Sequence, residues 1–270
     1  MAKIPQRNLL NEVLEEGLVE QKFRTYIGMS SLMGPCPRKI WYDFRWSYLK
    51  EIPKRVQRIF NRGHYEESVI INDFINAGIK IVSQQSEMVD STGHIKGHDD
   101  GILLNVPGAE KTPHLFEGKT MKHSRYVKYM REGLQRSDPV YWGQIHTYMG
   151  ELGLTRCVYG VVNKDTDERD FKRIKYEPDV HDQCMSIGFD ILTSEFPPKK
   201  IGEKTWFDCK FCSARGVCHK GEPILKTCRS CQHVSIEMGG NWSCGKHNGV
   251  LLSPDEQRRG CDQYELSEVL

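Results

Sequence analysis

Apolar residues recur every three or four positions in several parts of the chain, which is the spacing of one face of a helix. We therefore predict helices over residues 8–26, 56–78, 124–135, 139–152 and 178–195, and a turn that runs into a helical stretch over residues 30–46. The last helix should end before the Pro197-Pro198 pair, because proline does not continue a helix.

Short strand-like segments, separated by Gly, Pro and polar turns, fill the region between residues 79 and 120, and a further pair follows residue 154. Their ranges are 79–85, 94–104, 113–121, 155–164 and 170–177. After residue 198 the chain is rich in Cys, Gly and Lys and shows little periodicity. The order of elements predicts the α/β class, with a central mixed β-sheet flanked by helices.

The composition is typical of a soluble protein with an ordinary core, since 38% of the 270 residues are hydrophobic and the mean hydropathy is −0.56. Apolar runs fall short of the roughly 20 residues that cross a bilayer, and the polar N-terminus lacks a signal-peptide core. We therefore expect a cytoplasmic protein with no membrane partner. The net charge of +2 neither requires nor excludes nucleic acid, because basic residues cluster locally, as in residues 54–62, 119–128 and 199–204.

Glu117-Gly118-Lys119 lies in the strand-like segment 113–121. Residues two apart on a strand point to the same face, so a carboxylate and an ammonium meet there. Asp100, in the preceding segment, can meet Glu117 across a hairpin, whereas alternation places Asp99 on the opposite face. Two neighbouring carboxylates can hold Mg²⁺ or Mn²⁺, and the lysine can orient or deprotonate a water molecule, as phosphodiester hydrolysis requires.

An E-x-K triplet alone is a common surface charge pair, so its weight comes from the order of motifs around it. A predicted helix with Gly63-His64 precedes the strands, and a helix with Gln144 and Tyr148, four residues apart on one face, follows them. In this order of motifs the chain resembles RecB-type nucleases of the PD-(D/E)xK superfamily, and most of all the iron–sulfur CRISPR-associated nucleases and their phage-encoded relatives.

The resemblance spans roughly residues 30–220 and implies a restriction-endonuclease-like core with a role for each motif. It assigns a divalent cation to His64, Asp100 and Glu117. It implies that the catalytic residues are Asp100, Glu117, Lys119, Gln144 and Tyr148, with the last two pointing at the lysine and the substrate. An imidazole ligand would favour Mn²⁺ over Mg²⁺.

A first group of cysteines, Cys209, Cys212 and Cys218, has metal-ligand spacing and needs a fourth thiolate. Four thiolates bind either zinc or an iron–sulfur cluster, and spacing alone does not separate the two. The resembled nucleases hold a [4Fe–4S] cluster on one N-terminal and three C-terminal cysteines, which implies Cys36, in its C-P-R-K context, as the fourth ligand. Such a cluster would tie the two ends of the nuclease domain together.

A second group of cysteines lies in a C-terminal segment that is too short to bury a core of its own. The candidate ligands are Cys228, Cys231, Cys244 and either Cys261 or His247. We favour Cys261, because phage relatives of the resembled family carry a similar ending, and we expect a tetrahedral Zn²⁺. The chain is thus predicted to divide into a nuclease domain, residues 1–222, and a small Cys-rich, zinc-binding module, residues 223–270.

These motifs favour a Mg²⁺- or Mn²⁺-dependent DNA nuclease. The resemblance further implies an exonuclease acting on single strands or ends in DNA recombination, repair or replication, inside a bacterial or phage-infected cell, and it allows a recombination or replication protein as a partner. A structure-specific endonuclease with the same catalytic centre is the first alternative. A non-catalytic nucleic-acid-binding or assembly protein is the second.

Overall fold

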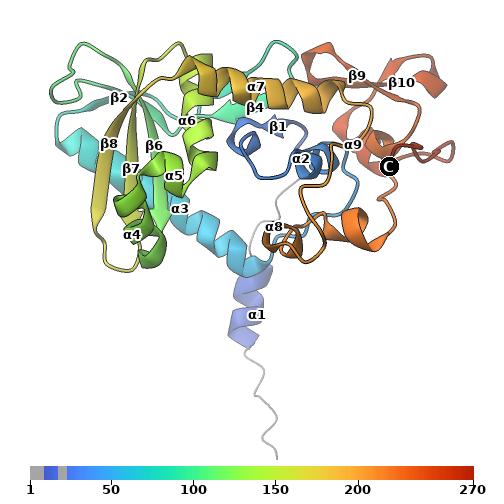
Figure 1. The fold of residues 1–270 in the computed structure, drawn as a ribbon, viewed down its shortest axis with the longest axis horizontal. Coiled ribbons are helices and arrows are strands. Elements are labelled where there is room, and N and C mark those ends of the chain that lie inside the picture. The colour runs from blue at the N-terminus through green and yellow to red at the C-terminus, as the bar shows by residue number, and fades with distance from the viewer. Residues whose placement is uncertain (1–8, 18–22) are drawn as a thin grey trace, which may run out of the picture.

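The computed structural model describes residues 9–17 and 23–270 (Figure 1). Its α-helices are α1 (Leu9–Glu16), α2 (Pro37–Phe44), α3 (Lys54–Asn76), α4 (His123–Glu132), α5 (Leu134–Ser137), α6 (Pro139–Glu151), α7 (Pro178–Thr193), α8 (Phe207–Lys210) and α9 (Pro254–Arg259). Its strands are β1 (Ile27–Gly28), β2 (Lys80–Ser83), β3 (Glu87–Val89), β4 (Ile95–His98), β5 (Gly101–Leu104), β6 (His114–Met121), β7 (Arg156–Asn163), β8 (Arg169–Lys175), β9 (Val234–Glu237), β10 (Asn241–Cys244) and β11 (Val250–Leu251). Single turns of 3₁₀ or π helix lie at Met29–Ser31, Gly216–Lys220, Cys228–Ser230, Met238–Gly240 and Gly245–His247.

The largest sheet has the strand order β2-β5-β6-β7-β8. Strands β6 and β7 run parallel and the other neighbours run antiparallel, so the predicted mixed sheet is confirmed. Neighbouring residues on β6 face opposite sides: Phe116 packs in a cluster with α3, its ring centroid 5.1 Å from that of Phe74, while Leu115 belongs to the cluster that contains Ile145 of α6. Helices therefore cover both faces of the sheet, as predicted (Figure 1).

A second sheet, β1-β4-β3, joins the N-terminal part of the chain to α7. Ile95 of β4 is fully buried and lies so close to Gly188 of α7 that a Cβ there would be 2.6 Å from the isoleucine methyl. The indole of Trp41, on α2, donates a hydrogen bond of 3.1 Å to the backbone carbonyl of Ser194, just after α7. These contacts hold α2 and α7 against the sheet.

The C-terminal segment packs onto the rest of the molecule through one buried tryptophan and one buried arginine. Trp242 of β10 is fully buried, and its ring lies 5.0 Å from that of Phe44 on α2. Arg229 is 1% exposed, with its guanidinium 3.9 Å from the Trp46 ring centroid and hydrogen bonds to the backbone carbonyls of Phe44 and Thr25. A buried guanidinium is tolerated only when it is paired in this way. Residues on both sides of the predicted boundary at residue 222, such as Phe44 and Trp242, belong to one hydrophobic cluster.

The segment 94–104, predicted as one strand, is two strands in different sheets. β4 ends at His98 and β5 begins at Gly101, because the intervening Asp99 turns inward and accepts hydrogen bonds from the Ser83 hydroxyl and the Ser86 amide. The side chain of Asp99 is thereby used to fix the turn rather than to extend the strand.

The predicted helix over residues 8–26 is also shorter than expected. α1 covers Leu9–Glu16, residues 8 and 18–22 lie outside the described residues, and residues 23–26 are not helical. The C-terminal region, in which little regular structure was expected, contains the antiparallel sheet β11-β10-β9 and α9. Across residues 9–17 and 23–270, no helix is both long enough and apolar enough to cross a membrane.

Candidate active site and cysteine clusters

The candidate centre lies where β5 and β6 pair. Gly101 is opposite Phe116 in this antiparallel pair, so Asp100 lies beside Glu117. One carboxylate oxygen of Asp100 accepts a hydrogen bond of 2.9 Å from the Gly118 amide, which holds Asp100 against β6. The neighbouring Asp99 points the other way, as the alternation predicted. The structure thus brings Asp100, and not Asp99, to Glu117.

Glu117 is completely buried. Its Oε1 accepts hydrogen bonds from the Lys119 ammonium and, at 2.7 Å, from the Gln144 amide of α6. Its Oε2 is buried and has no hydrogen-bond partner among residues 9–17 and 23–270. A buried acceptor without a partner costs about 1–3 kcal/mol, so this oxygen is where an additional ligand would bind most favourably.

The two charged groups perturb each other strongly. Burial, followed by the negative charge of Asp100, raises the pKa of the Glu117 carboxyl to about 8, although Lys119 opposes the shift. Burial alone would lower the pKa of Lys119, but the charges of Glu117 and Asp100 outweigh it and hold that pKa well above its usual range. These charges favour the ammonium form of Lys119 over the neutral amine.

Helix α6 supplies the two residues implied by the resemblance. Gln144 is 7% exposed and donates to Glu117, as described above. Tyr148, one turn further on and 4% exposed, lies over β4, where a Cβ on Gly97 would come within 2.7 Å of its ring. Burial raises the pKa of the Tyr148 phenol, and the charge of Glu117 adds to this. Both side chains thus lie at the centre on the shared helix face that the four-residue spacing predicts.

On α3 the structure places an acid at the centre that the sequence reasoning missed. The pKa of Glu67 is raised by burial and then by the charge of Asp100, and Glu67 in turn raises the pKa of Glu117. His64 is 3.8 Å from Glu67, but its side chain is 75% exposed. Glu67 lies three residues after His64 on the same helix face, and that spacing was the available signal.

Tyr141 lies beside Lys119, and Arg125 lies beside Tyr141. The ring of Tyr141, in the first turn of α6, is 5.1 Å from the Lys119 ammonium, and the guanidinium of Arg125 on α4 is 4.9 Å from the same ring. Arg125 also forms an ion pair with the buried carboxylate of Asp138. This arrangement presents a second fixed cation beside the centre, which suits a phosphate-bearing substrate.

The first cysteine group draws its members from both ends of the core. Cys36 immediately precedes α2, Cys209 lies on α8, and Cys212 and Cys218 follow it. Burial raises the pKa of the Cys209 thiol, and the charges of Cys36 and Cys218 raise it further, as Cys36 also does for Cys212. The four thiols are therefore near enough to interact electrostatically across more than 170 residues of sequence.

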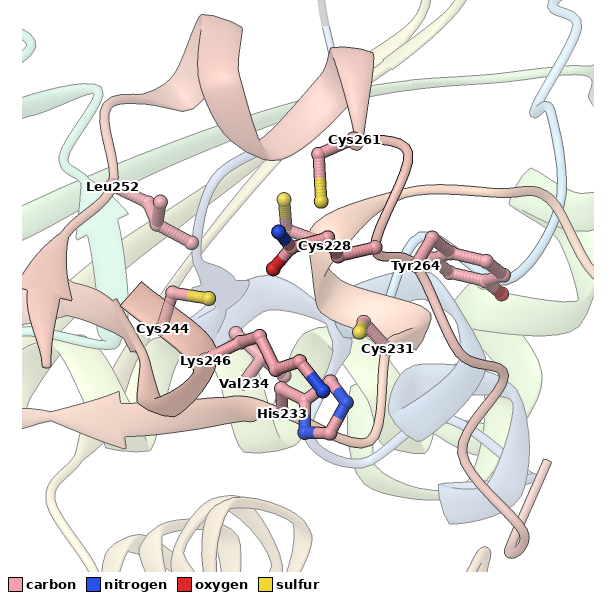
Figure 2. Close-up of a pocket in the computed structure, with 10 residues that line it drawn as sticks. Cys228, Cys231, His233, Val234, Cys244, Lys246, Leu252, Cys261 and Tyr264 are labelled. Atoms are coloured by element: carbon pink, nitrogen blue, oxygen red, sulfur yellow. The ribbon is translucent and has the colours of Figure 1, made fainter. Parts of the chain in front are cut away.

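The second cysteine group lines one pocket, into which the thiols are turned (Figure 2). Its four cysteines are Cys228, Cys231, Cys244 and Cys261. Burial raises the pKa of the Cys228 thiol to about 11, and the other three thiols each add to the shift. His247, the alternative fourth ligand, is not among the side chains that line the pocket.

The described residues contain no group of three or more His, Cys, Asp or Glu side chains that could hold a metal ion as they stand. Metal binding at the catalytic centre or at either cysteine group would therefore require the ligands to move closer together. Ligand side chains commonly draw together in this way, because metal binding and local ordering are coupled.

The sequence matches no family model and no curated protein. Solved structures with a similar backbone include SSO0001, which is 18% identical over 78% of this chain and 94% of that chain, with a TM-score of 0.46. The structure of LHK-Exo, an alkaline exonuclease from Laribacter hongkongensis, in complex with dAMP is 16% identical over 67% of this chain and 90% of that chain, with a TM-score of 0.47. A phage related exonuclease from Haemophilus somnus 129PT is 11% identical over 62% of this chain and 91% of that chain, with a TM-score of 0.46. At these low identities and TM-scores the likenesses assign neither a family nor an activity to this chain.

Proposed function

We propose that the protein is a Mn²⁺- or Mg²⁺-dependent DNA nuclease with Asp100, Glu117 and Lys119 at its catalytic centre. The observation that carries the proposal is the unpartnered, fully buried Oε2 of Glu117, beside Asp100 and a fixed ammonium. A divalent cation would give that oxygen its missing partner and remove the cost of placing two carboxylates side by side.

The cation ligands we propose are Asp100, Glu117 and Glu67. Oxygen ligands suit Mg²⁺ and Mn²⁺. The charge of Asp100 raises the pKa of Glu67, and the charge of Glu67 raises the pKa of Glu117, so the three carboxyl groups lie near one another. His64, the α3 ligand that the resemblance implies, lies one turn from Glu67 and would add an imidazole that favours Mn²⁺. Comparing Glu67→Gln with His64→Ala for Mn²⁺ affinity separates the two assignments.

The bound cation would supply Lewis-acid polarisation of the scissile phosphate. The residues of the chain divide the remaining work. Lys119, held as an ammonium, donates to a phosphate oxygen or orients the attacking water, and its raised pKa argues against a role as the base. Gln144 fixes the orientation of Glu117, and Arg125 neutralises phosphate charge beside Tyr141. The attacking water releases a proton to solvent as its oxygen bonds to phosphorus, the P–O bond to the leaving nucleotide breaks, and the leaving oxygen takes up a proton from solvent.

The finer assignment is an exonuclease that acts on single strands or ends, in recombination, repair or replication, inside a bacterial or phage-infected cell. It rests on the motif resemblance. The test is Mn²⁺-dependent cleavage of end-labelled linear DNA and of circular single-stranded DNA. Cleavage of linear DNA alone supports the exonuclease, cleavage of circles supports an endonuclease, and no cleavage of either by protein that binds DNA refutes the proposal.

We further propose a [4Fe–4S] cluster on Cys36, Cys209, Cys212 and Cys218, and a Zn²⁺ on Cys228, Cys231, Cys244 and Cys261. What supports them is the donor chemistry. The charges of Cys36 and Cys218 act on Cys209 in the first group, and four cysteines line one pocket in the second. Anaerobically purified protein should contain about four irons and one zinc. Two zincs and no iron would refute the cluster.

A further inference from the structure

The segment that follows α7 carries large aromatic side chains on the outside of the molecule. Their exposed fractions are 63% for Phe196, 53% for Trp206, 73% for Phe207 and 71% for Phe211. We call these four residues the aromatic platform. Aromatic side chains bury much apolar area when covered, so leaving four of them exposed in 16 consecutive residues of chain is costly unless something covers them.

Contacts within the segment and with the rest of the protein fix the position of the aromatic platform. On α8, Cys209 is buried and Phe207 is exposed. The ring of Phe207 lies 5.3 Å from that of Phe211, the exposed residue that follows the helix. Trp206 covers Gly202 so closely that a Cβ on that glycine would lie 2.3 Å from the indole. The loop also bonds to the body of the protein, since the Arg38 guanidinium donates to the carbonyl of Pro198 at 2.8 Å. The platform is therefore preorganised.

The platform is also basic. Residues 196–220 contain six lysines and arginines against two acids, Glu203 and Asp208. Lys199, Lys200, Lys204 and Lys210 lie between Phe196 and Phe211 along the chain, and the Lys210 ammonium lies 5.7 Å from the centre of the Phe211 ring. The lysines at positions 199, 200, 204 and 210 are all exposed.

We propose that the aromatic platform binds single-stranded DNA by stacking unpaired bases on its rings while the flanking lysines contact the phosphates. A single strand alternates base faces with phosphates, which matches the alternation of rings and lysines here. The base faces of a duplex are stacked inside it and cannot reach the rings. Duplex DNA would therefore bind this surface only through its phosphates, as it binds any basic patch. The proposal rests on the proposed nuclease function for its choice of DNA, and it places strand binding outside the catalytic centre.

The test uses the Glu117→Gln variant without divalent metal, so that binding is measured without cleavage. The probes are fluorescent oligo(dT), an abasic strand of the same length, and a duplex. Removing the rings in Phe207→Ala/Phe211→Ala, or in Trp206→Ala, should weaken oligo(dT) binding about 5- to 100-fold per ring and leave binding of the abasic strand unchanged. Met238→Ala removes an apolar side chain of similar exposure, 67%, and should change neither.

Lysine removal provides the second arm. Lys199→Gln/Lys200→Gln should weaken oligo(dT) and the abasic strand alike and reduce the salt dependence of both. Iron content and circular dichroism report whether each variant remains folded. The proposal would be overturned if the wild type and the ring variants bound oligo(dT) equally, or if the ring variants lost as much affinity for the abasic strand as for oligo(dT). Binding to anionic phospholipid vesicles without binding to oligo(dT) would overturn it as well. Ring variants that lose strand binding in a protein without nuclease activity would refute the proposed function and leave the platform standing.

Discussion

The sharpest consequence of the structure is that Mn²⁺ binding should release a proton from Glu117. Burial raises the pKa of Glu117 to about 8 in the metal-free protein, and a metal ligand must be deprotonated. At pH 7 this carboxyl is mostly protonated, so Mn²⁺ binding should release most of one proton. At pH 9 it is mostly ionised, so the release should be much smaller.

The direction of the pH dependence of Mn²⁺ affinity follows from the raised pKa of Glu117. Below pH 8 the proton competes with the cation, so the observed Mn²⁺ affinity should rise about tenfold per pH unit up to about pH 8 and then level off. Activity at limiting Mn²⁺ should follow the same curve, and saturating Mn²⁺ should flatten it. Calorimetric titration of Mn²⁺ in buffers with different ionisation enthalpies counts the protons directly.

Glu117→Gln is the matched control, because glutamine keeps an acceptor for Gln144 and has no proton to release in this range. Its residual Mn²⁺ binding should release clearly fewer protons at pH 7 than Mn²⁺ binding to the wild type. If the number of protons released on Mn²⁺ binding to the wild type did not change with pH, Glu117 would not be a buried, protonated carboxyl in the metal-free protein.

Three further predictions concern packing and ligand choice. Gly97→Ala places a methyl 2.7 Å from the Tyr148 ring, so it should lower the free energy of unfolding by about 1–3 kcal/mol in denaturant and lower the cleavage rate. Gly153→Ala, whose new methyl meets no atom within 4 Å, measures the backbone effect alone. Trp242→Ala removes a fully buried indole and should cost about 3–5 kcal/mol; a loss below 1 kcal/mol would show that the C-terminal segment folds apart from the core. Cys261→Ser should remove the zinc and His247→Ala should not, as measured by elemental analysis, and the reverse result would move the fourth ligand to His247.

The features that sequence reasoning predicted well depend on local periodicity. The placement of Asp100 and Lys119 on one face with Glu117 follows from the two-residue period of a strand, and the structure has that placement. Gln144 and Tyr148 likewise follow from helical spacing.

The features that were missed depend on contacts between distant parts of the chain. The three-residue spacing places Glu67 on the His64 face of α3. Only the packing of α3 across the sheet, a contact between distant parts of the chain, brings that face to the centre. The break between β4 and β5 depends on hydrogen bonds from Ser83 and Ser86 to Asp99. Arginine is rarely buried, and Arg229 is buried because aromatic rings and carbonyls from both ends of the chain surround it.

The central claim is that Asp100, and not its neighbour Asp99, forms part of a DNA-cleaving centre. The direct measurement is single-turnover cleavage of end-labelled single-stranded DNA with saturating Mn²⁺, comparing Asp100→Asn with Asp99→Asn. We predict that Asp100→Asn lowers the cleavage rate at least about 100-fold with an unchanged melting temperature, because Asp100 lies against β6 beside Glu117. Asp99→Asn should lower stability and leave the cleavage rate of the folded protein near that of the wild type. Full activity in Asp100→Asn would contradict the account.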